Sequence, residues 1–240
     1  MSLASLRDTL KPVERMSTGI REFDYVLGGG VVKGSIVLIS GAPGTGKSTL
    51  LLQTANNIAK GPRSSVLYAS GEQNQRDLLL YAERVGAIGN EHLDIIQQDE
   101  VYKIIDAAEE RKPALLIIDS VNAMYIDDVD ADVNSARQIE AIGNLVTSFA
   151  KKEEVAVLVV AHQAKDGSIR APQVLVHLVD TVVYFDPCVP DDDDEASVDT
   201  TLRVLETGNK NRYGESNVRK LLEMTAEGLK STKKGSSLAI

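Results

Sequence analysis

The sequence predicts an α/β fold with a mostly parallel sheet, helices on both faces, and an antiparallel extension near the C-terminus. Apolar, β-branched runs alternate with helical segments along most of the chain, as in parallel sheets with crossover helices. Aromatic residues make up 4% of the 240 residues and Trp is absent, so the core must consist of Val, Ile, Leu and Ala. That composition suits strands that are buried on both faces.

The elements expected before Pro172 follow one another as strand and helix. A short helix over 17–27 stops at three glycines, 28–30. The strands then cover 35–40, 65–69, 93–97, 114–118 and 155–160, and the helices cover 49–59, 75–85, 101–111 and 135–152. The last helix opens with the capping-box pattern Ser135-x-x-Gln138.

The pattern changes after Pro172. Strands are predicted over 182–185, 201–206 and 218–224 with no helix between them, so we interpret this part as the antiparallel extension. The length and a hydrophobic content of 43% suit one large domain, which we place at 17–229. We expect 1–16 to be a flexible arm and 230–240 a disordered tail.

Composition excludes several classes of protein. The single cysteine, Cys188, excludes an intramolecular disulfide framework and a cysteine-rich zinc site. No apolar run is long enough for a membrane span or a signal peptide, so a cytoplasmic location is expected.

The net charge of −9 weighs against indiscriminate binding of nucleic acid, although a local basic face remains compatible with it. Part of the excess is the acidic run 191–195. That run is either a solvated loop tip or an acidic segment that contacts a basic partner.

Residues 41–49 match G-x-x-x-x-G-K-[ST], the loop that binds nucleotide phosphates. An apolar strand precedes the loop and a helix follows it, which places the anion at a helix N-terminus. Lys47 is expected to contact the β- and γ-phosphates, and the Ser48 hydroxyl to bind Mg²⁺. The residues assigned to nucleotide binding are Gly41, Ala42, Pro43, Gly44, Thr45, Gly46, Lys47, Ser48 and Thr49.

Two carboxylates lie at or just beyond the ends of predicted strands, where ligands bind in open α/β sheets. Asp119 follows Leu-Leu-Ile-Ile directly and suits a role on Mg²⁺, although a strand-ending turn also uses Asp. Glu72 follows Tyr-Ala-Ser-Gly and is placed to orient and deprotonate the attacking water. A glutamate that simply begins a helix is the alternative for Glu72.

His162 and Gln163 end the strand over 155–160 and are candidates to sense the γ-phosphate. An ordinary hydrogen-bonded histidine is the alternative. The following loop carries Lys165 and Arg170 and either contacts a nucleic-acid backbone or forms a solvated hairpin. Lys210 and Arg212, two apart on an extended segment, point the same way and suit a phosphate contact in a neighbouring subunit. An ordinary basic turn is the simpler alternative for that pair.

These motifs together resemble the RecA-like ATPases, and most closely the ATPase domain of the bacterial RadA (Sms) family. The resemblance runs from about Arg15 to Leu229. Its specific part is Lys210-Asn-Arg-Tyr-Gly214, similar to the family's KNRFG motif with Tyr213 in place of Phe. The other matching stretches are shared across the RecA-like superfamily, including KaiC-like proteins; they begin at Ser17, Gly41, Leu67, Leu116, Ala161 and Val179.

The resemblance implies a ring or filament with ATP bound between subunits. Lys47, Ser48 and Thr49 would bind ATP and Mg²⁺ within one subunit, with Asp119 as the acid of the second nucleotide motif. Glu72 would be the catalytic glutamate, and His162 and Gln163 the γ-phosphate switch. Lys210 and Arg212 would act at the neighbour's nucleotide, and the loop from Lys165 to Arg170 would face DNA, with a recombinase as a possible further partner.

Two features of the RadA family are missing here: its four-cysteine zinc module and its C-terminal Lon-like domain. We therefore expect either the ATPase core of a longer protein or a minimal relative. The first functional hypothesis is an oligomeric DNA repair or recombination ATPase that binds single-stranded or branched DNA. The second is a KaiC-like, nucleotide-dependent assembly switch that binds a protein partner; the acidic composition favours it.

Overall fold

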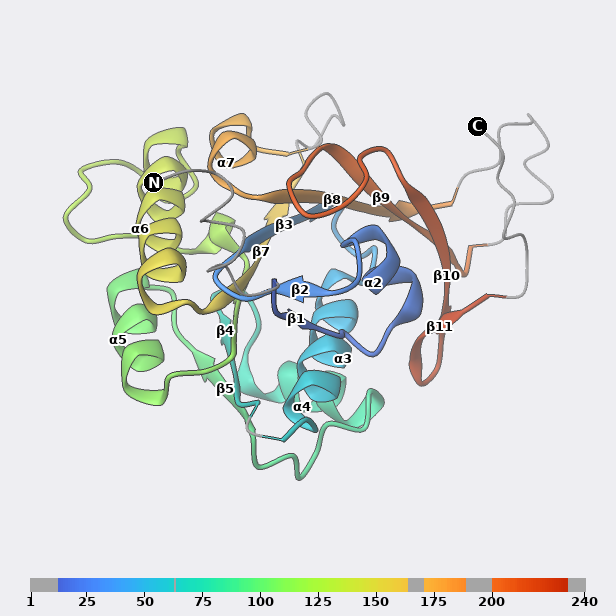
Figure 1. Cartoon of the computed structure of the whole chain (residues 1–240). Helices are drawn as coiled ribbons and strands as arrows, with labels where there is room; N and C mark the ends of the chain where they lie inside the picture. The colour runs from blue at the N-terminus through green and yellow to red at the C-terminus, as the bar shows by residue number, and fades with distance from the viewer. Residues whose placement is uncertain (1–12, 63, 164–170, 189–199, 233–240) are drawn as a thin grey trace, which may run out of the picture.

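The fold is built on one nine-stranded sheet whose parallel centre carries an antiparallel extension (Figure 1). A computed structural model describes residues 13–62, 64–163, 171–188 and 200–232. The strand order is β11-β10-β9-β8-β3-β7-β6-β4-β5. The five strands from β3 to β5 and the neighbouring β8 run parallel, and β9, β10 and β11 are antiparallel. The predicted fold class is confirmed.

The strands of the large sheet are β3 (Ile36–Gly41), β4 (Val66–Ser70), β5 (Leu93–Gln97), β6 (Leu115–Asp119), β7 (Ala156–His162), β8 (Thr181–Pro187), β9 (Leu202–Asn211), β10 (Arg219–Thr225) and β11 (Gly228–Ser231). A separate two-stranded sheet joins β1 (Arg15–Met16) to β2 (Val31–Val32). The helices are α2 (Arg21–Val26), α3 (Lys47–Ala59), α4 (Gln75–Arg84), α5 (Val101–Arg111), η1 (Val121–Ala123), α6 (Ala136–Glu153) and α7 (Gln173–Leu178).

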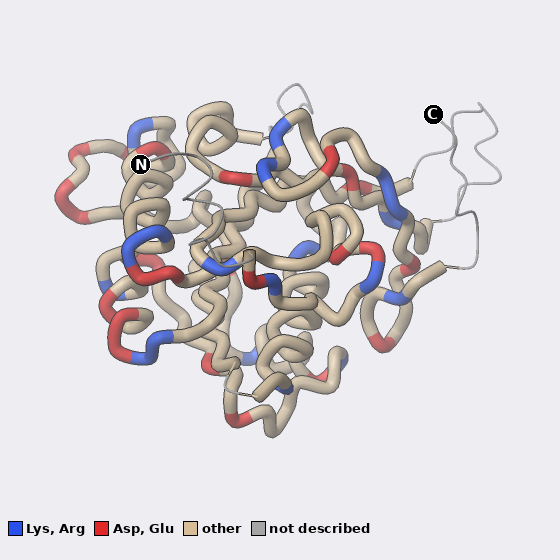
Figure 2. The backbone as a smooth tube through the Cα atoms, viewed as in Figure 1, with Lys and Arg blue, Asp and Glu red and all other residues tan. Residues whose placement is uncertain are grey.

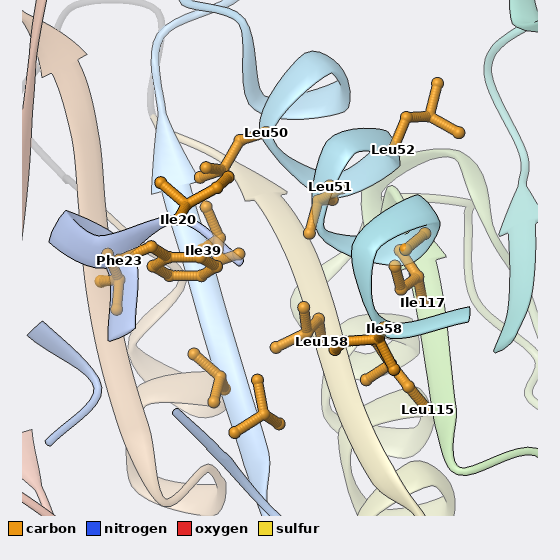
Figure 3. Close-up of a cluster of buried hydrophobic side chains, with 14 of the residues drawn as sticks. Ile20, Phe23, Ile39, Leu50, Leu51, Leu52, Ile58, Leu115, Ile117 and Leu158 are labelled. Carbon is orange, nitrogen blue, oxygen red and sulfur yellow. The ribbon is translucent and has the colours of Figure 1, made fainter. Parts of the chain in front are cut away.

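Two hydrophobic layers cover the two faces of the sheet. Alternate residues of β3 point into different layers, Val37 and Ile39 into one and Ile36 and Leu38 into the other. The first layer packs α2 and α3 on the sheet, as the side chains around Leu50 and Leu51 show (Figure 3). The second packs α5, α6 and α7 on the opposite face. Burial on both faces explains why these strands are continuous apolar runs.

Several elements differ from the sequence prediction. The helix expected over 17–27 begins only at Arg21, because Asp24 accepts hydrogen bonds from Ser17 Oγ and from the amide and hydroxyl of Thr18. The strand predicted over 182–185 as part of the antiparallel extension also belongs to the parallel sheet, because β8 pairs in parallel with β3 on one side and antiparallel with β9 on the other. Helix α7 was not predicted; it packs on α6, where Leu175 and Leu178 lie against Gly143.

The ends of the expected domain also differ. β1 lies within residues 1–16, which we expected to be a flexible arm, and pairs with β2. β11 continues to Ser231, although the disordered tail was expected from 230. Gln53 fixes this last strand, since its side-chain amide donates to Leu229 O and accepts from Leu229 N. The rest of the expected arm and tail lies largely outside the described residues.

Lys, Arg, Asp and Glu lie mainly on the helices and loops around the sheet and on the antiparallel strands β9 and β10 (Figure 2). The acidic stretch between β6 and α6 forms one projecting loop, which carries Asp127, Asp128, Asp130 and Asp132. None of the helices in the described part of the chain has the length and apolar character needed to cross a membrane.

Candidate nucleotide site at the carboxyl edge of the sheet

The residues predicted to bind phosphate and Mg²⁺ and to activate water lie together at one edge of the sheet, because four neighbouring parallel strands end there. Gly41 at the end of β3 pairs with His162 at the end of β7. Asp119 at the end of β6 pairs with Ser70 at the end of β4, two residues before Glu72. Residues far apart in the sequence are therefore neighbours, as expected for a ligand site in an open α/β sheet.

The phosphate loop joins β3 directly to the N-terminus of α3. Gly46 caps the helix in a left-handed conformation with φ of 101°, which glycine adopts without strain. A side chain at Gly41 would place its Cβ 2.0 Å from the carbonyl oxygen of Phe185, so only glycine lets β3 approach β8 there. Arg203 Nε donates to Thr45 O at 2.8 Å and steadies the loop from β9.

Lys47 is buried within this loop. Its Nζ donates to the carbonyl oxygens of Gly41 at 2.9 Å and Ala42 at 2.8 Å. Burial lowers the pKa of the ammonium, and the carboxylates of Asp119 and Glu72 oppose that shift. The cation therefore faces the concave side of the loop, where an anion would replace the two carbonyls as its partner.

Asp119 and Ser48 form a contact suited to a hard cation. Ser48 Oγ donates to Asp119 Oδ2 at 2.7 Å, and the buried Tyr68 hydroxyl donates to the same oxygen. Gln73 Nε2 donates to Ser48 Oγ at 3.0 Å, while the buried Oε1 of Gln73 has no hydrogen-bond partner among the described residues. Burial raises the pKa of Asp119, although the bonds from Tyr68 and Ser48 counteract it. The burial of the Tyr68 hydroxyl and the nearby Asp119 carboxylate raise the pKa of Tyr68 well above its usual value.

The donor chemistry fits Mg²⁺ in the presence of a nucleotide. A serine hydroxyl and a carboxylate are oxygen ligands of the kind Mg²⁺ prefers, and Mg²⁺ normally completes its shell with phosphate oxygens and water. Among the described residues there is no group of three or more His, Cys, Asp and Glu that would hold a metal ion by itself. Ser48 and Asp119 would therefore hold the ion together with the nucleotide.

Glu72 and His162 contact each other across the ends of β4 and β7. His162 Nε2 lies 2.8 Å from Glu72 Oε1, and Ser120 Oγ donates to the same carboxylate oxygen. The bond from His162 holds the pKa of Glu72 below its ordinary value despite partial burial. Asn122 Oδ1 accepts from the backbone amide of His162 at 2.8 Å and fixes that strand end. Glu72 is thus an ionised, oriented carboxylate beside the phosphate loop.

Lys210 and Arg212 lie at the opposite edge of the sheet. β9 runs antiparallel to β8, so Asn211 pairs with Thr181 at the beginning of β8. At about 3.3 Å per residue, the six residues of β3 separate this edge from the phosphate loop by roughly 17 Å. The pair therefore cannot contact the phosphate loop of its own chain.

The sequence prediction missed four polar residues that support the site: Tyr68, Gln73, Ser120 and Asn122. Tyr68 lies within an apolar strand, so its position in the sequence did not indicate a role in the site. Its hydroxyl bonds to Asp119 because β4 and β6 are neighbouring strands. Gln163 is half-buried just after β7. Lys165, Arg170 and the acidic run 191–195 lie outside the described residues.

Comparisons with known proteins agree with this geometry. A family model described as an AAA domain matches residues 5–168. The chain is 37% identical over 230 residues to DNA repair protein RadA of Escherichia coli, covering 96% of this chain and 47% of that protein. It is 39% identical over 215 residues to DNA repair protein RadA of Bacillus subtilis, covering 90% and 44%. It thus spans about half the length of the curated relatives it matches.

The fold is also found among solved structures. A KaiC-like protein from Pyrococcus horikoshii superposes with a TM-score of 0.72 at 19% identity, covering 91% of this chain and 98% of that one. At this level of identity the likeness concerns the fold alone.

Proposed function

Because the chain belongs to the AAA family of P-loop ATPase domains and is homologous to bacterial DNA repair protein RadA, we propose that it is an ATP-dependent DNA repair or recombination ATPase. It would bind single-stranded or branched DNA and hydrolyse ATP at the interfaces of a homo-oligomer. The carrying observation is the convergence of Lys47, Ser48 and Asp119 with Glu72 at one edge of the sheet.

ATP binding would use the loop and the helix start together. The backbone N–H groups at the beginning of α3 would bind the phosphate oxygens, and Lys47 would exchange its two carbonyl partners for them. Ser48 and Asp119 would hold Mg²⁺, which when bound supplies positive charge to the phosphate oxygens. Tyr68 and Gln73 keep that hydroxyl and carboxylate in place.

Hydrolysis would require Glu72 as the general base. Its lowered pKa keeps the carboxylate ionised at neutral pH, so that it can orient a water and accept its proton. His162 shares the carboxylate and lies directly before the segment that carries Lys165 and Arg170. A change at the γ-phosphate would therefore alter the Glu72–His162 bond and be passed to that segment, which we propose contacts DNA.

Lys210 and Arg212 would complete the site of a neighbouring copy. Their distance from the phosphate loop of their own chain excludes action there, whereas two cations at the opposite edge suit a copy packed edge against edge. ATP would then lie between subunits and couple its hydrolysis to their contact.

DNA-dependent turnover tests the proposal. We expect single-stranded DNA to stimulate ATP hydrolysis at low salt and the stimulation to fall as salt rises, because phosphate contacts release counterions. ATP turnover is measured across a salt series, with Lys47→Ala as the variant that should lose hydrolysis altogether. Hydrolysis that persists in Lys47→Ala would show that the phosphate loop is not the site.

A nucleotide-dependent assembly switch that binds a protein partner is the second candidate. The net charge of −9 favours it, since DNA binding needs a local basic surface. Turnover that is abolished by Lys47→Ala but indifferent to DNA at every salt concentration would support this candidate against the first.

A further inference from the structure

Asp180 is a buried carboxylate at the edge of the sheet opposite the phosphate loop. It lies between α7 and β8, and its side chain is 1% exposed. Oδ1 accepts from Arg212 Nη1 at 2.6 Å, and Oδ2 accepts from Lys151 Nζ at 2.7 Å and the Ile36 amide at 3.0 Å. Burial alone would raise the pKa of Asp180, but these bonds hold it below its ordinary value. The carboxylate is therefore ionised and fixed by three donors.

The backbone carbonyl of Asp180 binds the same segment around Arg212 that the Asp180 side chain binds. The amide of Arg212 donates to Asp180 O at 3.0 Å, and Thr181 Oγ1 donates to Asn211 Oδ1 at 3.1 Å. Arg212 is thus bound to one residue through both its main chain and its guanidinium. The bond from Ile36, the first residue of β3, ties this arrangement to the strand that leads into the phosphate loop.

Lys210 is held by the residues just before Asp180. Its Nζ donates to the carbonyl oxygens of Val176 at 2.8 Å and His177 at 2.6 Å, in the last turn of α7. One short connection, residues 176–180, therefore positions both cations. The Arg212 side chain is 56% exposed, and its bond to the Asp180 carboxylate uses Nη1, so the guanidinium has further N–H groups with which to bind a second anion.

We propose that Asp180 is a positioning residue that orients Arg212 toward the nucleotide of a neighbouring copy. This inference rests on the proposed function, in which Lys210 and Arg212 act across the subunit interface. An arginine on a loop end samples many rotamers, and a fixed carboxylate restricts them to the one that presents the guanidinium. Within the described part of the chain, the carboxylate of Asp180 bonds to Arg212, Lys151 and Ile36 and to no residue of the phosphate loop 41–49.

The test uses Asp180→Asn in assemblies mixed with other variants. Asp180→Asn should bind ATP with unchanged affinity, because its own phosphate loop is intact, and should lose turnover as Arg212→Ala does, by at least about tenfold. Mixing with Lys47→Ala should restore turnover, since Lys47→Ala subunits still supply a correctly held Arg212. Mixing with Arg212→Ala should restore none, and the double variant should be no worse than Arg212→Ala alone.

Asp94→Asn is the matched control, because it removes the carboxylate of another Asp–Arg pair, with Arg111, and should keep full turnover. If Asp180→Asn does not fold, Asp180→Glu keeps the buried charge but displaces Arg212 by one methylene, and should show the same loss and the same rescue. Full turnover in whichever variant folds, or loss of its ATP binding, would overturn the role of Asp180. If mixing with Lys47→Ala does not restore the turnover of Arg212→Ala, the result contradicts the proposed function itself, in which Arg212 acts at the nucleotide of a neighbouring copy.

Discussion

The contact between Glu72 and His162 is the most informative one at the scale of single residues. Both were candidates from their positions near the ends of two strands; they are 90 residues apart in the sequence, and His162 Nε2 lies 2.8 Å from Glu72 Oε1. The hydrogen bond explains the lowered pKa of Glu72 and gives a physical link between Glu72 and the end of β7. Proton acceptance by Glu72 and the effect of His162 on the pKa of Glu72 can therefore be tested separately.

Glu72→Gln should bind ATP and fail to hydrolyse it. The amide keeps the size of the side chain but cannot accept a proton from water, so turnover should fall by about 10²–10⁴. Nucleotide binding by calorimetry and phosphate release measure the two properties separately. The control is Glu83→Gln on the exposed face of α4. Turnover of Glu72→Gln within about twofold of the parent would exclude Glu72 as the base.

His162→Ala should move the acidic limb of the pH–rate profile to higher pH. His162 holds the pKa of Glu72 below its ordinary value, so without it the carboxylate becomes protonated at a higher pH as the solution is acidified. The measurement is kcat/KM for ATP across the acid range, with the exposed His92→Ala as control. If the acidic limb of His162→Ala falls at the same pH as in the parent protein, His162 does not set the protonation of Glu72.

At the scale of elements, the sequence predicted those helices, strands and loops that a few adjacent residues specify, and missed those that depend on packing between distant segments. The phosphate loop, the central strands and the cap at Ser135 were predictable, since each is specified by a few adjacent residues. Helix α7 was not, because Val174 and Val176 favour a strand and the helix is stabilised by packing against Gly143 in α6. The contacts of Tyr68 and Asn122 depend on strand order, which no local pattern specifies.

The turn after β9 shows how an element positions the basic pair. Gly214 lies against the backbone of Gly28, and a Cβ at Gly214 would be 2.8 Å from Gly28 Cα. Asn211 Nδ2 also donates to Val26 O at 3.1 Å, and Arg15 Nη2 donates to Tyr213 O at 2.8 Å. The glycine of the Lys-Asn-Arg-Tyr-Gly motif is therefore required by close packing of the turn on the end of α2.

Gly214→Ala should destabilise the protein by about 1–3 kcal/mol, because the added methyl group would overlap backbone that cannot move aside cheaply. For a chain of this size, each kcal/mol corresponds to a fall in Tm of about 2–4 °C. Thermal unfolding is compared with Ser216→Ala, an exposed substitution in the same turn. An unchanged Tm in Gly214→Ala would show that the turn does not depend on this close approach.

At the scale of the whole molecule, the candidate functional residues lie at two opposite edges of the sheet. The phosphate loop, Glu72 and Asp119 lie at the carboxyl edge of the parallel strands, and Lys210 and Arg212 at the other. Under the proposal of a site shared between copies, the cations of one chain would face the phosphate loop and carboxylates of the next. The sequence indicated both groups of residues, but their placement on opposite edges became clear only from the antiparallel pairing of β9 with β8.

The measurement that tests this account most directly is ATP turnover in mixtures of Lys210→Ala and Lys47→Ala. Each variant alone should be inactive, the first because its neighbours lack the Lys210 ammonium and the second because its phosphate loop lacks the Lys47 ammonium. Turnover should appear on mixing and be greatest near equal proportions, since only mixed interfaces combine an intact loop with an intact Lys210. Inactivity at every ratio, with both variants folded and assembling together, would contradict a site shared between copies.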